Sequence, residues 1–266
     1  MNESTSPLGM TLEMREQVSS WFEQPLGRSL LACEAERLRA LLPGLYASNV
    51  LQLGRLGGID LFESCNAPQR FLLESSPVSG DSGVRALPES LPFEHNSIDM
   101  VLLPHTLDFC LDPHRVLREV ERVLMPESHI VILGFNPYSF WGLKRSMIRR
   151  SRRHAPWNGH FIGVHRMKDW LKLLQFEVTH GSMMYYRPPL QKSASLDRFR
   201  VLDKLGDRWW PMMGGAYLLA AKKRVEGMTP IQPRWKLSVV RSGKAAQEAA
   251  TRGIAAKKPD GKQALG

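Results

Sequence analysis

The chain has 266 residues, a formal net charge of +10 and 43% hydrophobic residues. This length and composition are sufficient for one large α/β core, and no apolar run is long enough to span a bilayer. The three cysteines, Cys33, Cys65 and Cys110, are widely spaced and odd in number, and the first residues lack the pattern of a signal peptide. We therefore expect reduced thiols and a cytoplasmic protein.

The positive charge is concentrated in two places. Residues 144–153 contain six basic residues and no acid, and residues 222–266 carry a balance of +8, so the rest of the chain has a net charge of −4. The excess of basic residues therefore lies in one segment and a tail. The isoelectric point of the whole chain does not describe the core, whose net charge is negative. The tail has few large apolar residues, so we expect residues 225–266 to be disordered.

The N-terminal part of the chain predicts two helices, over residues 11–22 and 27–42. The second helix has an apolar stripe that would pack on a core, so residues 1–44 are interpreted as a helical cap. A strand over residues 50–53 follows and runs into the glycine-rich turn 54–58. Glycines there permit unusual backbone dihedral angles and allow backbone amides to approach a cofactor closely.

An acid follows the next predicted strand. Residues 70–73 are apolar enough for a short strand, and Glu74 comes directly after them, about twenty residues beyond Gly54. An acid at this place can accept hydrogen bonds from both hydroxyls of a ribose. The alternative is a solvent-facing glutamate at the end of a strand.

A complete strand, helix and strand unit occupies the middle of the chain. Residues 98–103 form an apolar run too short for a helix, typical of a strand buried on both faces. Asp112 is a good N-cap and Pro113 suits the first helical position, so a helix is predicted from there to Pro126. Residues 129–133 then form a second strand, which must lie parallel to the first.

The letters of this unit resemble the class I S-adenosylmethionine-dependent methyltransferases, in particular the type 11 group. Members carry LPF, a few polar residues, FD, a hydrophobic strand, DP, LREV and RVLKPGG, and this chain has LPFEHNSIDMVLL, HTLDF and DPHRVLREVERVLMPES. The resemblance implies a Rossmann-like α/β fold, with a seven-stranded, mostly parallel sheet flanked by helices, over residues 45–224. It also implies S-adenosylmethionine as cofactor and methyl transfer as activity.

The cofactor loop departs from the family pattern VLDLGCGTG. Gln52 stands where the family has an acid and Leu56 stands where it has the middle glycine, whereas Gly54 and Gly58 remain. The resemblance places Gln52, Gly54 and Gly58 at the cofactor. A leucine at a point of close backbone approach should obstruct the methionine part of the cofactor unless the loop takes another path. The alternative is a turn that no longer holds a ligand.

The resemblance places three further residues around the cofactor: Glu74, Glu89 and His105. The family keeps an acid at Glu74, and ALPESLPF resembles its DAEALPF, in which Leu87 replaces an aspartate that often contacts adenine. His105 and Asp108 belong to a segment at the C-terminal edge of the sheet, where ligands of open α/β sheets bind. For each of these two residues, a loop-packing or capping role is the alternative.

The segment after the strand over residues 129–133, which the resemblance makes the fifth strand of the fold, contains the candidates for the acceptor side, Asn136 and Tyr138. They superficially resemble the NPPY box of amino-methylating enzymes, although that box follows the fourth strand. Residues 144–153 then combine basic and hydrophobic side chains in a pattern that suits RNA, an anionic surface or a lid over the site. The alternative is a docked helix with a solvated face.

The C-terminal part predicts a helix with an apolar stripe over residues 167–174 and a strand that starts with residues 176–179. Residues 196–205 predict an inserted helix. The final strand is expected over residues 215–222, and the resemblance implies that it enters antiparallel between the fifth and sixth strands.

The sequence thus favours S-adenosylmethionine-dependent methyl transfer to an unidentified acceptor. The sulfonium of this cofactor is already activated, so such enzymes chiefly align the acceptor and exclude water, and neither a catalytic base nor a metal site is predicted. The competing hypothesis is a non-catalytic binding module with the same fold and a decayed cofactor loop. Its working surface, toward RNA or an anionic surface, would be residues 144–153 and the tail.

Overall fold

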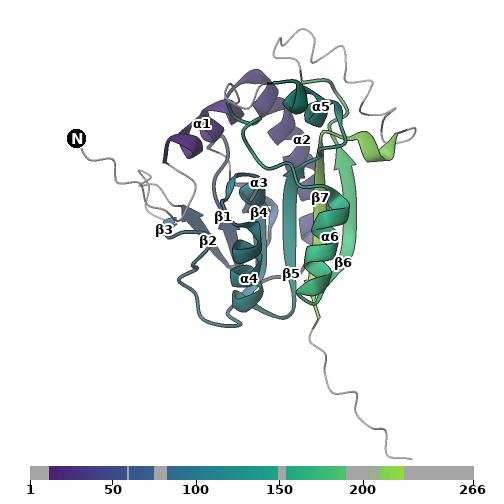
Figure 1. Cartoon of the computed structure of the whole chain (residues 1–266). Helices are drawn as coiled ribbons and strands as arrows, with labels where there is room; N and C mark the ends of the chain where they lie inside the picture. The colour runs from purple at the N-terminus through teal and green to yellow at the C-terminus, as the bar shows by residue number, and fades with distance from the viewer. Residues whose placement is uncertain are drawn as a thin grey trace, which may run out of the picture. The chain divides into compact units, whose positions relative to one another are not determined.

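The computed structural model describes residues 12–58, 60–74, 83–148, 154–189, 203, 206 and 210–224. They form one sheet with helices on both faces (Figure 1). The predicted tail, residues 225–266, and the helix predicted over 196–205, apart from Asp203, lie outside the described residues. Within the described part, no helix is both long and apolar enough to cross a membrane.

The secondary structure matches most of the predicted elements. The strands are β1 (Asn49–Leu53), β2 (Gln69–Glu74), β3 (Gly83–Arg85), β4 (Ile98–Pro104), β5 (Leu124–Phe135), β6 (Phe176–Met184) and β7 (Ala216–Lys223). The α-helices are α1 (Leu12–Phe22), α2 (Pro25–Leu41), α3 (Thr106–Phe109), α4 (Pro113–Val123), α5 (Phe140–Met147) and α6 (Val164–Leu173). Short 3-10 turns are η1 (Leu42–Gly44), η2 (Leu61–Ser64) and η4 (Pro211–Met213).

The sheet has seven strands in the order β3-β2-β1-β4-β5-β7-β6. The first five of these are parallel to one another, and β7 is antiparallel to both β5 and β6. The predicted mixed sheet of the class I methyltransferase fold is therefore confirmed. The direction of winding reverses between β1 and β4, and ligands of open α/β sheets bind at the carboxyl ends of strands at such a reversal.

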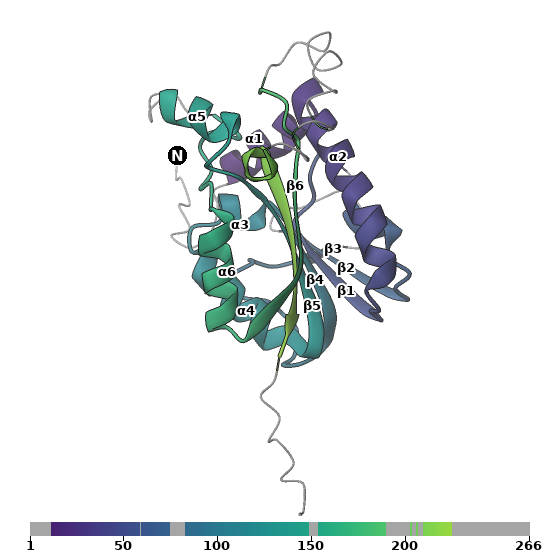
Figure 2. The ribbon, with the colours of Figure 1, turned by 90° about the vertical axis from the view of Figure 1, so that its right-hand side faces the viewer.

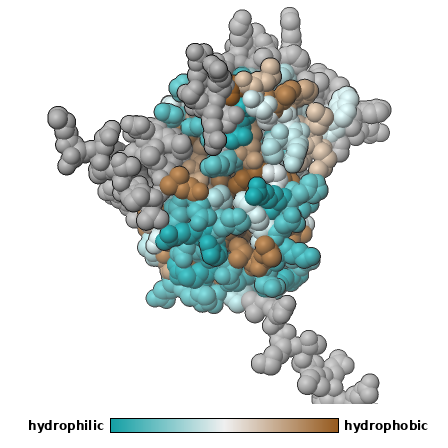
Figure 3. Space-filling model, viewed as in Figure 1, coloured by the Kyte–Doolittle hydropathy of each residue, from teal (hydrophilic) through white to brown (hydrophobic). Residues whose placement is uncertain are grey.

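Two hydrophobic layers hold helices on the sheet. In Figure 2 the sheet is seen nearly edge-on, with α2 on one side and α4 and α6 on the other. The first layer joins α1 and α2 to the sheet, and the second joins α4 and α6 to it. The outward faces of α4 and α6 are mainly hydrophilic (Figure 3). The central strands are buried along nearly their whole length, which explains their continuous apolar runs.

Helix α4 begins as predicted and ends earlier than predicted. The side chain of Asp112 accepts hydrogen bonds from two backbone amides of the first turn, at 3.0 and 3.1 Å. The helix ends at Val123, and Pro126 lies within β5, so the prediction that this proline ends the helix is wrong. Leu124 pairs with Ile98 of β4 and adopts an extended conformation, because strand pairing takes over before the proline is reached.

Candidate functional site

The carboxyl ends of β1, β2 and β4 are joined directly at the point where the sheet reverses its winding. The amide of Gly54 donates to the carbonyl of Leu73 at 2.9 Å, which links the end of β1 to β2. The hydroxyl of Thr106 donates to the carbonyl of Leu53 at 2.6 Å, which links the segment after β4 to β1. The glycine turn therefore lies between these strand ends, as the sequence predicts.

The glycine turn has the backbone conformation that requires glycine. Gly54, Gly57 and Gly58 have φ angles of 93°, 53° and 73°. A Cβ atom at Gly57 would lie 3.3 Å from atoms of Phe22 and Leu31, so the turn packs there against the N-terminal helices. A Cβ atom at Gly54 or Gly58 would meet nothing within 4 Å. These two positions therefore leave open space beside the backbone, as a turn that cradles a ligand requires.

Gln52 shapes this turn from inside the protein. Its side chain is fully buried, and its amide nitrogen donates to the carbonyl of Gly54 at 2.9 Å. Its amide oxygen accepts from the backbone amide of Leu61 at 3.0 Å. An ionised acid, which the family has here, could accept from Leu61 but could not donate to Gly54. The glutamine therefore fastens both ends of the turn with one side chain.

Leu56 packs in the hydrophobic core and is only 6% exposed. It belongs to the same cluster as Phe22 and Leu31 of the N-terminal helices. No atom of Leu56 approaches within 4 Å of the Cβ positions at Gly54 and Gly58. The turn thus takes a path that buries the leucine, and the open space beside the two glycines is kept.

Glu74 lies at the end of β2, where the sequence places it, with its side chain 11% exposed. A carboxylate oxygen of Glu74 lies 4.0 Å from Nε of Arg55, in the glycine turn. The guanidinium of Arg55 also donates two hydrogen bonds of 2.7 Å to Asp60, which raise the pKa of Arg55. Sequence reasoning missed this basic neighbour, although Arg55 stands within the motif.

Glu89 is also buried, in a turn closed by a bridge between Leu87 and Ser90. Among the described residues, its Oε2 atom has no hydrogen-bond partner. Burial raises the pKa of the neighbouring Cys110 thiol, and the charge of Glu89 adds to this effect. Burying a carboxylate oxygen without a hydrogen-bond partner costs free energy. A ligand that donates a hydrogen bond to this oxygen of Glu89 would remove that cost.

His105 lies at the centre of a buried cluster of three ionisable side chains. It follows β4 with a left-handed backbone conformation, φ 51°. Its Nδ1 lies 2.8 Å from Asp108 and its Nε2 lies 2.8 Å from Glu34 of α2. All three side chains are at most 1% exposed, and Asp108 also accepts a hydrogen bond of 3.0 Å from the amide of Phe135.

The cluster holds its histidine in the charged form. Burial lowers the pKa of His105, but the charges and hydrogen bonds of Glu34 and Asp108 outweigh it and raise the pKa to about 9. Burial raises the pKa of Asp108, which His105 opposes. The rings of Phe22 and Phe135 lie against the imidazole, with centroid distances of 5.6 and 4.1 Å. Both ring nitrogens are thus engaged within the protein, and the cluster ties α2 to the end of β4.

Sequence reasoning missed Glu34, although it left a signal. Leu30, Glu34 and Leu38 follow one another at helical spacing, so the acid lies within the apolar stripe of α2. A charged residue on a face that packs against a core is almost never left without a partner. The stripe therefore indicates a buried ionic contact, but not the histidine that forms it.

The two acceptor-side candidates occupy different environments. Asn136 is 1% exposed; its side-chain nitrogen donates to the carbonyls of Met212 and Gly214, and its oxygen accepts from the amide of Tyr138. Its side-chain nitrogen thus holds the segment before β7, and its oxygen holds the backbone at Tyr138. Tyr138 is 74% exposed and borders a cavity near the first turn of α6.

The basic segment begins as a docked helix. Lys144, on α5, donates to the carbonyl of Pro189 at 2.7 Å and lies over the ring of Trp157. Arg145 donates to the carbonyl of Gly159 at 3.0 Å. The arginines that follow, within residues 149–153, lie outside the described residues. The described part of the segment therefore packs on the domain.

Comparison with known proteins assigns the family. A family described as a methyltransferase domain, the type 11 group, matches residues 43–132. YafS, an uncharacterized protein of Escherichia coli K12, is 33% identical over 211 residues, which cover 79% of this chain and 82% of YafS. The chain belongs to the type 11 methyltransferase family. The sequence-based assignment is therefore confirmed, and the cofactor of this family and fold is S-adenosylmethionine.

Two further proteins are similar to this chain, one in structure and one in sequence. A methyltransferase structure from Thermotoga maritima superimposes with a TM-score of 0.56 at 16% identity, covering 80% of this chain and 97% of that one. This likeness shows the fold. The ubiquinone/menaquinone biosynthesis C-methyltransferase UbiE of Escherichia coli O1:K1 is 26% identical over 160 residues, which cover 54% of this chain and 64% of UbiE.

Proposed function

We propose that this protein binds S-adenosylmethionine across the ends of β1, β2 and β4 and transfers the methyl group to an unidentified acceptor. The observation that carries the proposal is the turn after β1. Its glycines have positive φ angles and leave open space at Gly54 and Gly58, and it lies beside the strand that ends in Glu74. A turn and an acid at a winding reversal are the two elements with which this kind of fold holds a nucleoside.

The residues at the sheet edge fit the chemical groups of the cofactor. The backbone at Gly54 and Gly58 can be approached closely, and Glu74 offers a carboxylate for the ribose hydroxyls. Glu89 has an oxygen that can accept a further hydrogen bond. The cofactor, when bound, supplies an activated methyl group.

The protein's own contribution is to orient the reactants and to exclude water. The helices α1 and α2 cover the glycine turn through Phe22 and Leu31. The ionic contact between Glu34 and His105 holds α2 against the end of β4. A site that is covered in this way favours methyl transfer. A dry, fixed geometry aligns the acceptor with the methyl group and keeps water away.

Isothermal titration calorimetry with S-adenosylmethionine and S-adenosylhomocysteine tests the proposal. We expect a micromolar dissociation constant, which corresponds to a binding free energy of about −8 kcal/mol. Glu74→Gln should weaken binding by about tenfold or more, because a charge-assisted hydrogen bond to the ribose is lost. Glu94→Gln removes the same charge at an exposed position and should leave the affinity unchanged. Absence of heat and of any thermal shift at millimolar ligand, in folded protein, would overturn the proposal.

A further inference from the structure

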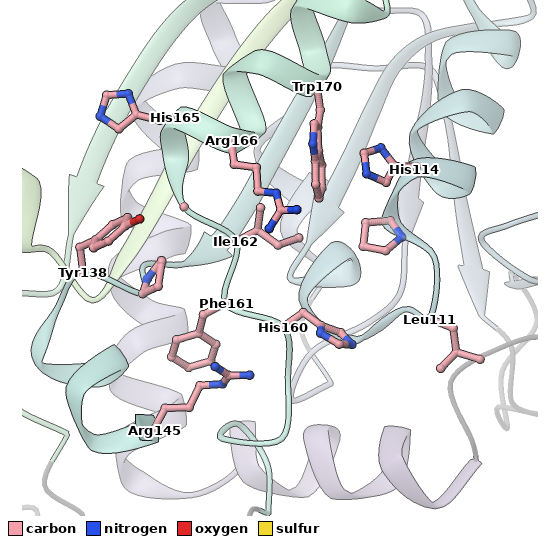
Figure 4. A pocket seen from close by; sticks show the side chains of 13 residues that line it. Leu111, His114, Tyr138, Arg145, His160, Phe161, Ile162, His165, Arg166 and Trp170 are labelled. Carbon is pink, nitrogen blue, oxygen red and sulfur yellow. The ribbon is translucent and has the colours of Figure 1, made fainter. Parts of the chain in front are cut away.

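A cavity lies at the same end of the sheet as the glycine turn, between the first turns of α4 and α6 and the chain segment that precedes α6. Its volume is about 510 Å³, within the range of small-molecule sites. Its lining comes from α4, α5, α6 and the segments before each of these helices (Figure 4). None of the residues proposed to hold the methyl donor lines it.

The lining is cationic and contains no acid. It includes two arginines and three histidines, and no aspartate or glutamate. In Figure 4, Arg166, His114 and His160 reach toward the same space, while His165 points away from it. Within the part of the chain that the structure describes, Arg166 forms no ion pair, and its guanidinium lies 5.3 Å from the ring centroid of Trp170. An aromatic ring holds a guanidinium in place without neutralising its charge.

Aromatic rings form the walls of the cavity. The ring of His114 lies 4.0 Å from the ring of Trp170, centroid to centroid. The guanidinium of Arg145 lies 5.1 Å from the ring of Phe161, and both of these residues line the cavity. The cavity thus combines cationic hydrogen-bond donors with aromatic rings in its lining, a pairing that suits an anion carried on a ring.

The two helices that border the cavity start differently. Helix α4 has its first amides capped by Asp112. Helix α6 starts after Gly163, which lines the cavity and contributes no side-chain cap. The first amides of α6 therefore add a favourable electrostatic environment for an anion beside Arg166.

We propose that this cavity binds a small organic anion, a phosphate or carboxylate group attached to a planar ring. The guanidinium of Arg166 and the imidazole rings of His114 and His160 contact the anionic group, and the rings of Phe161 and Trp170 contact the planar part. The absence of acids in the lining disfavours cationic ligands. This site is separate from the residues proposed to hold the methyl donor, and the binding proposed for it does not depend on methyl transfer.

Calorimetric titration with phenyl phosphate and benzoate, with phenol as the neutral counterpart, tests the proposal. We expect both anions to bind with submillimolar dissociation constants and phenol to give no heat. Arg166→Gln should weaken anion binding by about tenfold or more, because a charged hydrogen-bond donor is lost. Arg39→Gln, an exposed arginine on α2, makes the same charge change on the other face of the sheet and should have no effect.

Further measurements separate a built site from general surface charge. His160→Ala, at a second exposed position of the cavity, should also weaken binding of phenyl phosphate. Inorganic phosphate should bind more weakly than phenyl phosphate, because it has no planar ring to contact Phe161 and Trp170. Equal losses in the Arg166 and Arg39 variants, or no anion binding at millimolar ligand in folded protein, would overturn the proposal. Titration with S-adenosylmethionine in the same samples tests the proposed methyl-donor site independently.

Discussion

His105 shows how far single residues could be predicted. Its position at the end of β4, and hence at the edge of the winding reversal, follows from the strand pattern. Its environment does not, because Glu34 lies 71 residues away in the sequence and Phe135 belongs to another strand. Asp108, three residues on, was a candidate that proves to be a partner of the histidine. Long-range packing therefore decided the chemistry of this residue.

The charged histidine makes stability depend on pH. The pKa of His105 is about 9 in the folded protein, and a histidine in an unfolded chain has a pKa of about 6.5. Its contribution is therefore complete below pH 6.5 and is lost as the pH rises through 9. We expect the free energy of unfolding to fall over this range by on the order of 3 kcal/mol, measured by urea denaturation at successive pH values.

Two substitutions assign this pH dependence to its residue. His105→Gln should be less stable than wild type at pH 6 and should show a flatter profile in the alkaline range, because the titrating group is gone. His95→Gln changes an exposed histidine and should keep the wild-type slope. An unchanged slope in the His105 variant would contradict the assignment of a protonated buried histidine.

At the scale of elements, the sequence located six of the seven strands but not β3, and it predicted some helix ends poorly. Strands β1 and β4 were recognisable because both of their faces are buried along most of their length, which leaves largely apolar runs. The end of α4 was not, because the pairing of Leu124 with Ile98 is a tertiary contact. The path of the glycine turn also depended on tertiary packing, since Leu56 finds its place among residues of α1 and α2.

The turn after β1 depends on one side chain, which provides a test at this scale. Gln52→Leu would leave the amide of Leu61 and the carbonyl of Gly54 without their partners. We expect the free energy of unfolding to fall by about 2 kcal/mol. The same variant should bind S-adenosylmethionine more weakly, because the turn is no longer held at both ends. Urea denaturation and calorimetry measure the two effects.

A matched change on β2 provides the control. Gln69 is exposed at the start of that strand, so Gln69→Leu should alter stability by less than about 0.5 kcal/mol and leave the affinity unchanged. Wild-type stability in the Gln52 variant would show that its two hydrogen bonds do not hold the turn.

At the scale of the whole molecule, the last strand connects regions that are distant in the sequence. β7 lies between β5 and β6, so the C-terminal end of the described domain completes its sheet. The Nζ atom of Lys223 lies 2.6 Å from the carbonyl of Glu121 and 2.9 Å from that of Leu124. It also forms an ion pair of 2.9 Å with the carboxylate of Glu121. The resemblance predicted the place of this strand, but not the lysine that links it to α4.

Neighbouring lysines at the end of β7 test whether this link stabilises the domain. Lys223 has a side chain that is 7% exposed, so Lys223→Met should lower the free energy of unfolding by about 2 to 3 kcal/mol, because buried acceptors lose a charged donor. Lys222 is 28% exposed and pairs with Glu127, which is 49% exposed, so Lys222→Met should cost less than about 1 kcal/mol. Urea denaturation of both variants measures the difference. Equal costs would mean that the burial of Lys223 does not decide its contribution, and that pairing of β7 with β5 and β6 alone holds the end of the domain.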